Sequence, residues 1–219
     1  MASIISTLDL LPPLLEGAAV TIQITGLSAG VALVLAFVAG FGRLSKYSPV
    51  RIITAFYVEV FRGTSLLVQL FWLFFALPML GIELSPMAAG VVALALNYGA
   101  YGSEVVRSSI LAVPKGQTEG AIALNMTPVQ RMRRIILPQA FMIMLPAFGN
   151  LLIELLKGTS LVSLITLTDL TFKGMMLRTF DISRTPEIFA CMLGIYFVLA
   201  YSLTLAVRWI ERKVTAGRV

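Results

Sequence analysis

Residues 113–140 read VPKGQTEGAIALNMTPVQRMRRIILPQA and form the only long polar interruption between two hydrophobic blocks of the chain. Four basic side chains lie in this stretch: Lys115, Arg131, Arg133 and Arg134. Because an excess of Lys and Arg marks the cytoplasmic loops of membrane proteins, we expect residues 113–140 to lie on the cytoplasmic side of a membrane.

The first half of this stretch predicts a short helix over residues 117–124. Thr118 can cap this helix, and Glu119 would then lie in the first turn, where a helix N-terminus favours negative charge. Asn125 is the predicted stop, because Asn tolerates the left-handed conformation that ends many helices.

The second half predicts another short helix, over residues 128–137. Thr127 would cap it, Pro128 would take its first position, and Pro138 would close it. Two short helices that meet at a turn form a rigid loop. Such a loop can fit a groove on a partner and transmit its motion.

The same residues resemble the cytoplasmic loop of ABC importer permease subunits, whose pattern is E-A-A, three residues, Gly, nine residues and I-x-L-P. Five positions match at this spacing: Glu119, Ala121, Ile135, Leu137 and Pro138. Gly120 replaces the first Ala of the pattern, and Asn125 replaces its Gly. Gly weakens a helix by about 1 kcal/mol relative to Ala, so we expect the first short helix to depend on its partner for order.

The flanking sequences resemble the polar-amino-acid branch of that family. They are FRGTSLLVQL at 61–70, AVPKGQ at 112–117, LPQA at 137–140 and LLKGTSLVSL at 155–164. The resemblance implies a type I transmembrane domain over 17–210 with its coupling loop at 113–140. A segment at 1–16 would precede it outside the membrane, and a cytoplasmic tail at 211–219 would follow it.

Composition independently indicates an integral membrane protein. The 219 residues are 58% hydrophobic and 13% charged, with a mean hydropathy of +0.91, whereas soluble domains carry about 25% charged residues. With no His and one Cys, the chain cannot form a His/Cys metal site, an internal disulfide or a Ser-His triad, and we expect Cys191 to be a packing residue. The net charge of +6 lies mostly in membrane-flanking loops, so topology explains it better than nucleic-acid binding.

Five hydrophobic runs are long enough to cross a bilayer, which takes about 20 helical residues. They lie at 17–42, within 52–80, from 86 to about 110, from 139 towards 165, and at 188–207. Pro78 and Gly81 are the predicted stops of the second run. Residues 169–187 read as a mixed polar outer segment that is partly helical. The prediction is thus an all-α membrane protein of five transmembrane helices.

Basic residues set the expected orientation. Twelve of them fall on one face of this arrangement and three on the other, which places the N-terminus outside and the C-terminus in the cytoplasm. Residues 1–42 contain no Lys or Arg, so we do not expect a secretory signal peptide there.

A short internal repeat occurs once in the second hydrophobic run and once in the fourth. Residues 59–67 read EVFRGTSLL, and residues 154–162 read ELLKGTSLV, 95 positions later. We interpret the two copies as having a shared physical role. Gly, Thr and Ser at these points permit either close helix approach or a local break.

Three acid–base pairs with i,i+3 spacing lie in the runs: Glu59/Arg62, Glu104/Arg107 and Glu154/Lys157. Each pair can neutralise itself on one helix face. A charge at the centre of a span costs about 2.5–3.5 kcal/mol, so each pair requires an explanation. We expect Glu104/Arg107 to be structural at the inner rim. Glu154/Lys157 could equally line a pathway or stabilise a dimer.

Uncharged polar residues accompany these pairs at similar depth. A mixed lining of this kind suits a zwitterion, although hydrogen bonds between helices explain any one residue equally well. The candidate pathway residues are Glu59, Arg62, Thr64, Ser65, Gln69, Asn97, Tyr98, Tyr101, Asn150, Glu154, Lys157, Thr159 and Ser160.

The resemblance implies a non-enzymatic permease subunit in the bacterial cytoplasmic (inner) membrane, for a polar amino acid or a related zwitterion such as ectoine. The chain has no G-x-x-x-x-G-K-[ST] loop, so ATP and Mg would bind a partner ATPase. The implied partners are a second permease subunit, two ATPase subunits, an extracytoplasmic solute-binding protein and membrane lipid, with Glu119 at the ATPase contact. The alternatives are a self-sufficient ion-coupled carrier or channel, and a structural scaffold.

Overall fold

The structure is a computed structural model that describes residues 9–216. Residues 1–8 of the predicted outer segment, and residues 217–219 of the predicted tail with Arg218, lie outside the described residues. Every regular element within 9–216 is helical, which confirms the predicted all-α class. In order they are α2 (Leu11–Arg43), α3 (Ser48–Gly63), α4 (Leu66–Phe71), η1 (Trp72–Ala76), η2 (Leu77–Leu80), α5 (Pro86–Ala112), α6 (Lys115–Ala123), α7 (Pro128–Arg131), η3 (Met132–Ile136), α8 (Leu137–Gly158), η4 (Thr159–Ile165), α9 (Leu170–Phe180), η5 (Ile182–Arg184) and α10 (Thr185–Ala216).

Three continuous helices in the described residues are long and apolar enough to cross a membrane. They are Leu11–Arg43, Pro128–Ile165 and Ile182–Val214. Ser48–Gly63 and Leu66–Leu80 add a fourth crossing if the bent pair counts as one. α5 is 27 residues long, but its second half carries Glu104 and Arg107.

The first span is longer than the prediction of 17–42, because its helix begins at Leu11. Pro12 and Pro13 lie in the first turn, where the N–H groups have no helical acceptor and a proline therefore loses nothing.

The second span is not one continuous helix over 52–80. α3 ends at Gly63, Thr64 and Ser65 are extended, and the chain resumes as α4 after a bend of 104°. This confirms the local break that the Gly-Thr-Ser sequence permits. The predicted stop at Gly81 is also confirmed, with φ at +83°, whereas Pro78 lies inside the last 3-10 turn, η2, and does not end it.

The second copy of the repeat does not break in this way. α8 passes at Gly158 directly into the 3-10 turn η4, which ends at Thr166 with φ at +63°. Thr159 is buried there and donates its hydroxyl to the carbonyl of Leu156 at 2.7 Å, whereas Gly63, Thr64 and Ser65 are exposed. The two copies therefore differ in backbone conformation, so a shared local break is not the role that they have in common.

The predicted helix closure at Pro138 is also wrong, because Pro128–Ile165 runs as one helix. η3 is a π-helical turn, in which Leu137 N–H reaches back five residues to the carbonyl of Met132. This wider turn directly precedes Pro138, which lies in the first turn of α8 and continues the helix although it has no N–H to donate.

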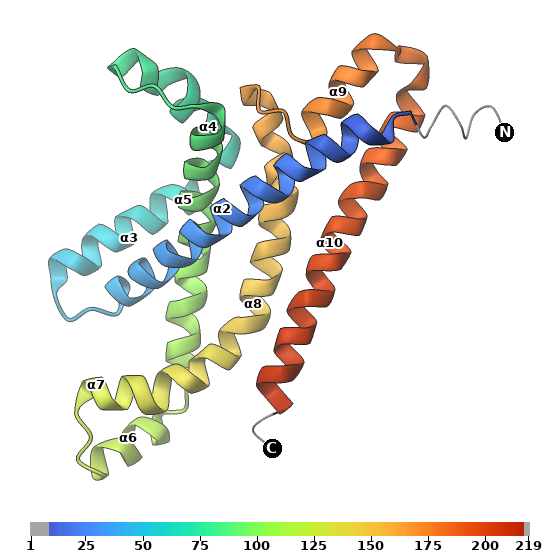
Figure 1. The fold of residues 1–219 in the computed structure, drawn as a ribbon. Coiled ribbons are helices and arrows are strands. Elements are labelled where there is room, and N and C mark those ends of the chain that lie inside the picture. Colours follow the sequence, from blue (N-terminus) through green and yellow to red (C-terminus); the bar gives the residue numbers. More distant parts are fainter. Residues whose placement is uncertain (1–8, 217–219) are drawn as a thin grey trace.

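The outer segment 169–187 is partly helical as predicted, with α9 and η5 inside it. The last helix, α10, begins at Thr185 and extends to Ala216, beyond the predicted 188–207 at both ends. Figure 1 shows α6 and α7 together at one end of the molecule and α9 at the opposite end.

Small residues let α2 cross α5 closely. A Cβ added to Gly102 would lie 2.8 Å from the Cβ of Ala36, and one added to Gly40 would lie 2.7 Å from the Cβ of Val106. Such approach is typical of helices packed in lipid, where van der Waals contact replaces the hydrophobic effect. In Figure 1, α2 lies diagonally across α5 and α8, which is the frame that positions the candidate sites.

Candidate functional site

The first short helix of the 113–140 loop starts earlier than predicted. α6 begins at Lys115 after Pro114, which takes the cap position, and Gln117 N–H donates to the Pro114 carbonyl at 3.0 Å. Thr118 therefore lies inside the helix and is not its cap, and Glu119 lies beyond the first turn. Pro114 has φ fixed near the helical value and no N–H to satisfy, so it starts this helix without a polar cap.

The turn between the two short helices follows the prediction. Asn125 has φ at +54°, in the left-handed region. Its N–H donates to the carbonyl of Ile122 at 2.8 Å, and Met126 N–H donates to the carbonyl of Ala121 at 3.0 Å. These bonds satisfy carbonyls that the end of α6 would otherwise leave free.

The start of the second short helix is also confirmed. The Thr127 hydroxyl accepts from Gln130 N–H at 3.3 Å, and the Gln130 side chain accepts from Thr127 N–H at 3.0 Å. This reciprocal capping box, with Pro128 in the first turn, fixes the direction in which α7 leaves the turn.

Hydrophobic packing and one polar contact hold the base of the loop. A buried cluster joins α5, the loop and α8; its members are Val106, Ile110, Val113, Ile136, Ala140 and Met144. The Gln139 amide donates to the Gln117 side-chain oxygen at 3.3 Å, which ties α6 to the first turn of α8. The loop is thus a rigid extension of α5 and α8.

The tip of the loop exposes apolar side chains next to an acid. Leu124 is 77% exposed, Val129 is 74% exposed and Ile122 is 54% exposed, and Glu119 is also exposed. An exposed apolar group with a polar neighbour on a rigid loop indicates a protein interface.

The structure divides the predicted coupling residues between tip and base. Glu119 and Gly120 are exposed on α6, Ala121 is buried beneath them, and Asn125 makes the turn. The three remaining positions lie half-buried on the continuous helix that carries the loop: Ile135, Leu137 and Pro138.

Two of the candidate pathway residues satisfy the break in the second span. The Gln69 amide donates to the Phe61 carbonyl at 3.0 Å and to the Thr64 hydroxyl at 2.7 Å. The Asn97 amide donates to the same Phe61 carbonyl at 3.0 Å and to the Gln69 side-chain oxygen at 3.1 Å. A helix end leaves carbonyls without donors, so these amides are structural.

Tyr98 is likewise tied, since its hydroxyl donates to the Glu154 carbonyl at 2.9 Å and joins α5 to α8. Thr159 is buried and Ser160 is half-buried in η4. Sequence reasoning missed a further bond of this kind, from the Tyr57 hydroxyl to the Leu96 carbonyl at 2.7 Å.

The other candidates leave their side chains exposed in the described part of the molecule. They are Glu59, Arg62, Thr64, Ser65, Tyr101, Asn150, Glu154 and Lys157. The Arg62 guanidinium lies over the Tyr101 ring, 5.3 Å from its centre. Tyr101 is one turn from Tyr98, whose hydroxyl bonds the backbone of Glu154, so a cation, two phenols and the Glu154 segment of α8 follow one another in one band.

Only one of the three predicted acid–base pairs forms among residues 9–216, namely Glu104 with Arg107. Glu104 also accepts from Arg43 and lies 3.9 Å from Arg62, so it joins α2, α3 and α5. Arg62 therefore turns toward Glu104 and not toward Glu59. The pattern of spacing within one helix could not show a carboxylate shared between three helices.

Sequence reasoning also missed the buried acid Asp169. Its carboxylate caps α9 by accepting from Phe172 N–H at 2.9 Å, and the Tyr196 hydroxyl lies 3.5 Å away. Leu170 N–H donates to the Thr21 hydroxyl at 3.1 Å, so this corner joins α9 to α2 and α10. Burial raises the pKa of Asp169 to about 6.

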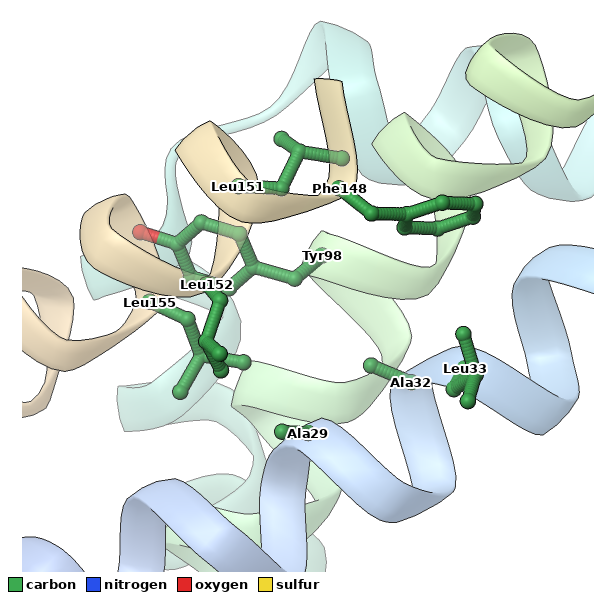
Figure 2. Close-up of a pocket in the computed structure, with 8 residues that line it drawn as sticks. All are labelled: Ala29, Ala32, Leu33, Tyr98, Phe148, Leu151, Leu152 and Leu155. Atoms are coloured by element: carbon green, nitrogen blue, oxygen red, sulfur yellow. The ribbon is translucent and has the colours of Figure 1, made fainter. Parts of the chain in front are cut away.

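Two cavities between the helices differ in the side chains that line them. One, of about 180 Å³, lies between α2, α5 and α8. Figure 2 shows its lining of apolar side chains, with Tyr98 as the polar exception. A larger one of about 730 Å³ lies between α8 and α10, with Lys157, Ser160 and Tyr201 in its lining. Of these two cavities, the second has the more mixed lining, as expected for a polar solute.

Comparison with known proteins identifies the class. Residues 32–216 match the model of the family described as the binding-protein-dependent transport system inner membrane component. This range covers most of the chain, so the protein belongs to that family. Within it, the chain is an amino-acid ABC transporter permease subunit.

Individual relatives support this assignment. The chain is 51% identical over 216 residues to the probable amino-acid ABC transporter permease protein y4tF of Sinorhizobium fredii, covering 96% of this chain and 90% of that protein. It is 39% identical over 202 residues to the L-cystine transport system permease protein TcyB of Bacillus subtilis, covering 92% and 86%.

Solved structures share the fold. A crystal structure of an amino acid ABC transporter with histidines superposes with a TM-score of 0.90 at 33% identity, covering 95% of this chain and 97% of that one. The inward-facing MetNI methionine ABC transporter gives a TM-score of 0.76 at 21% identity, covering 92% of this chain and 95% of that one, and at this identity shows the fold alone.

Proposed function

We propose that this chain is the membrane permease of an importer that carries a polar amino acid into the bacterial cytoplasm, driven by ATP hydrolysis on separate subunits. The observation that carries the proposal is the 113–140 loop, whose base is buried between α5 and α8 and whose tip exposes Glu119 beside apolar side chains. A groove on an ATPase subunit is the partner that fits such a tip.

The proposed topology has five crossings in the inner membrane. α3 to η2 counts as one bent crossing and α5 as another, in addition to the three continuous apolar helices. The excess of Lys and Arg supports a cytoplasmic loop and C-terminus and an external N-terminus. A second permease subunit, two ATPases, an external solute-binding protein and surrounding lipid complete the assembly, with ATP and Mg on the ATPases.

The proposed pathway follows the exposed polar band. Arg62 and Glu154 offer opposite charges, and Tyr101 and Tyr98 lie between them. An amino acid carries a carboxylate and an ammonium, so a lining that offers both charges with phenols between them suits it.

The names of three relatives support an amino acid as the solute. One carries the name of an L-cystine permease, another of an arginine permease (ArtQ of Bacillus subtilis), and a third of a glutamine permease (GlnP of Escherichia coli). All three solutes are zwitterionic amino acids, which supports an amino acid here. A compatible solute such as ectoine shares that charge pattern and belongs in the same test.

The test is uptake into vesicles that contain the permease with its candidate ATPase and solute-binding protein. We expect ATP-dependent uptake of at least one of cystine, arginine, glutamine, histidine or ectoine. Glu119→Arg should abolish uptake while the protein remains in the membrane at wild-type amounts. Glu83→Arg, on the exposed link before α5, is the matched control and should transport normally.

Two results would contradict the proposal. The first is solute flux through the purified chain alone without ATP, which would indicate a self-sufficient carrier or channel. The second is full uptake by Glu119→Arg, which would remove the loop tip from the coupling contact.

A further inference from the structure

Two cavities follow one another along the seam between α8 and α10. The larger, about 730 Å³, extends toward Ser160, and the smaller, about 240 Å³, extends toward Arg208 and Glu211. Both are lined by Ile153 and Thr204, so they meet at those side chains. The seam is therefore hollow from the end of α8 to the last turns of α10.

The smaller cavity brings together four polar groups of different chemistry. Arg208 supplies a guanidinium, and Glu211 supplies a carboxylate one turn further along α10. Asn150 supplies an amide from α8, and Thr204 supplies a hydroxyl whose hydrogen is donated to the Ala200 carbonyl at 2.8 Å. The Thr204 oxygen can still accept a hydrogen bond.

The wall on the α8 side is formed at Pro146 and Gly149. Pro146 lies inside α8 and lines the cavity. Gly149 lets α8 approach α10 closely, because a Cβ there would overlap the Val207 side chain. This contact belongs to the same wall and closes one side of the cavity.

Size and charge together define the class of ligand. A volume of about 240 Å³ corresponds to roughly eight waters at ~30 Å³ each, below the ~300–1,000 Å³ of sites for drug-sized ligands. A guanidinium binds a carboxylate through paired N–H donors, and a carboxylate or amide oxygen accepts from an ammonium. The lining therefore fits a single zwitterionic amino acid.

We propose that this cavity is a second amino-acid site, open to the cytoplasm, and that its occupancy slows import of the same solute. The inference rests on the proposed function, which places this end of α10 in the cytoplasm. The ligand carboxylate binds Arg208, and its ammonium faces Glu211 and Asn150. Because α8 continues without interruption into η3 and α7, a ligand held between α8 and α10 restrains the helix that carries the loop.

The first experiment measures binding to the purified chain in lipid nanodiscs, with radiolabelled arginine, histidine and glutamine as probes. We expect Arg208→Gln to remove one bound amino acid per chain, and Arg208→Lys to restore part of it. Arg212→Gln, one turn further on and outside the lining, is the matched control and should bind as the wild type does. Identical binding curves for Arg208→Gln and the wild type, including no binding to either, would overturn the proposal.

The second experiment measures ATP-driven uptake into vesicles of the complete importer that are preloaded with amino acid. Inhibition is expressed relative to each variant's own rate with empty vesicles. We expect Arg208→Gln to raise the internal concentration for half inhibition at least tenfold relative to Arg212→Gln, and internal histamine, which has no carboxylate, to inhibit neither. Equal inhibition of both variants, or none of the wild type, would refute the regulatory role.

The proposed function and this inference fail in different ways. An importer that moves no amino acid contradicts the proposed function, and the binding curves still decide whether the site exists. An importer that moves amino acids without internal inhibition supports the proposed function and contradicts the regulatory role.

Discussion

Residues 63–66 and 158–161 both read Gly-Thr-Ser-Leu, yet the chain folds them in opposite ways. In the first copy Thr64 and Ser65 are exposed and extended, and the second span bends there by 104°. The second copy is a 3-10 turn whose Thr159 is fully buried. The comparison teaches that this sequence permits a break, while packing from elsewhere in the chain decides whether the break occurs.

The neighbours of each copy explain the difference. Around the first copy, Gln69 and Asn97 supply donors for the Phe61 carbonyl that the break leaves free. Around the second copy, Tyr98 lies against Gly158, and the turn that follows packs Val162 and Ile165 into the core. The helix cannot turn away there without emptying that core.

The largest effect is expected for Gly158→Ala. A Cβ at this position would lie 2.6 Å from the Tyr98 hydroxyl oxygen, so the tyrosine must move and its bond to Glu154 must lengthen. Overpacking of this kind costs up to about 3 kcal/mol. The measurement is the thermal midpoint of the purified permease in detergent, which should fall.

Gly63→Ala is the matched control, because a Cβ there would meet nothing within 4 Å. It should leave the midpoint unchanged or raise it slightly, since Ala favours the helix end. If both variants were equally destabilised, the two copies would differ less in packing than the structure indicates.

Asn97→Leu is expected to cost about 2 kcal/mol, within the range for leaving a buried polar group without its partner. The variant keeps the branched skeleton of Asn97 but removes a donor from the Phe61 carbonyl and from the Gln69 side chain. Thr159→Val makes the corresponding change in the second copy, where the bond to the Leu156 carbonyl is lost, and should cost about 1 kcal/mol. The reverse order in thermal midpoints would show that the break is not held by these amides.

Much of the architecture was predictable because local chemistry decides it. The left-handed Asn125, the Thr127 cap and the stop at Gly81 each follow from the preferences of single residues. The helical class follows from the need to satisfy backbone groups in lipid. These features are short-range, so a sequence displays them directly.

The errors share a different physical origin. Glu104 binds Arg43 across 61 positions, and Asp169 lies beside Thr171 and Tyr196, which belong to different helices. Spacing within one helix contains no information on such contacts. Some candidate pathway residues are hydrogen-bonded to other helices, and others have exposed side chains. The sequence could not show this division either, because it depends on which carbonyls the other helices leave without a donor.

Asp169 lies shortly after the second copy of the repeat. Asp169→Asn tests how the charge of its buried carboxyl affects the stability of the fold. The native pKa of about 6 exceeds the ordinary 3.8, so the folded state binds the proton more tightly than the unfolded state. The resulting stabilisation is complete below about pH 4 and is lost as the pH rises through 6. Asn keeps the cap without a charge, so the variant should be about 1–2 kcal/mol more stable than the wild type at pH 7.

The measurement is the thermal midpoint of both proteins between pH 4 and pH 8, and the difference should grow across pH 4–6. A flat difference for Asp169→Asn would mean that the buried carboxyl does not titrate in this range.

The smallest effect, about 1 kcal/mol, is expected for Gly120→Ala in the coupling loop. This variant distinguishes packing within the chain from packing against a partner. A Cβ on Gly120 would meet nothing within 4 Å, as at Gly63, so Ala should stabilise α6 through helix propensity alone. Hydrogen exchange of the α6 amides should slow accordingly in the isolated permease. If α6 is ordered by its partner, transport should remain at wild-type levels, because the family pattern carries Ala at this position. Slower exchange together with lost uptake would instead show that the ATPase surface requires the bare backbone of Gly120. The ATPase would then approach α6 more closely than the exposed side chains at the tip of the loop suggest.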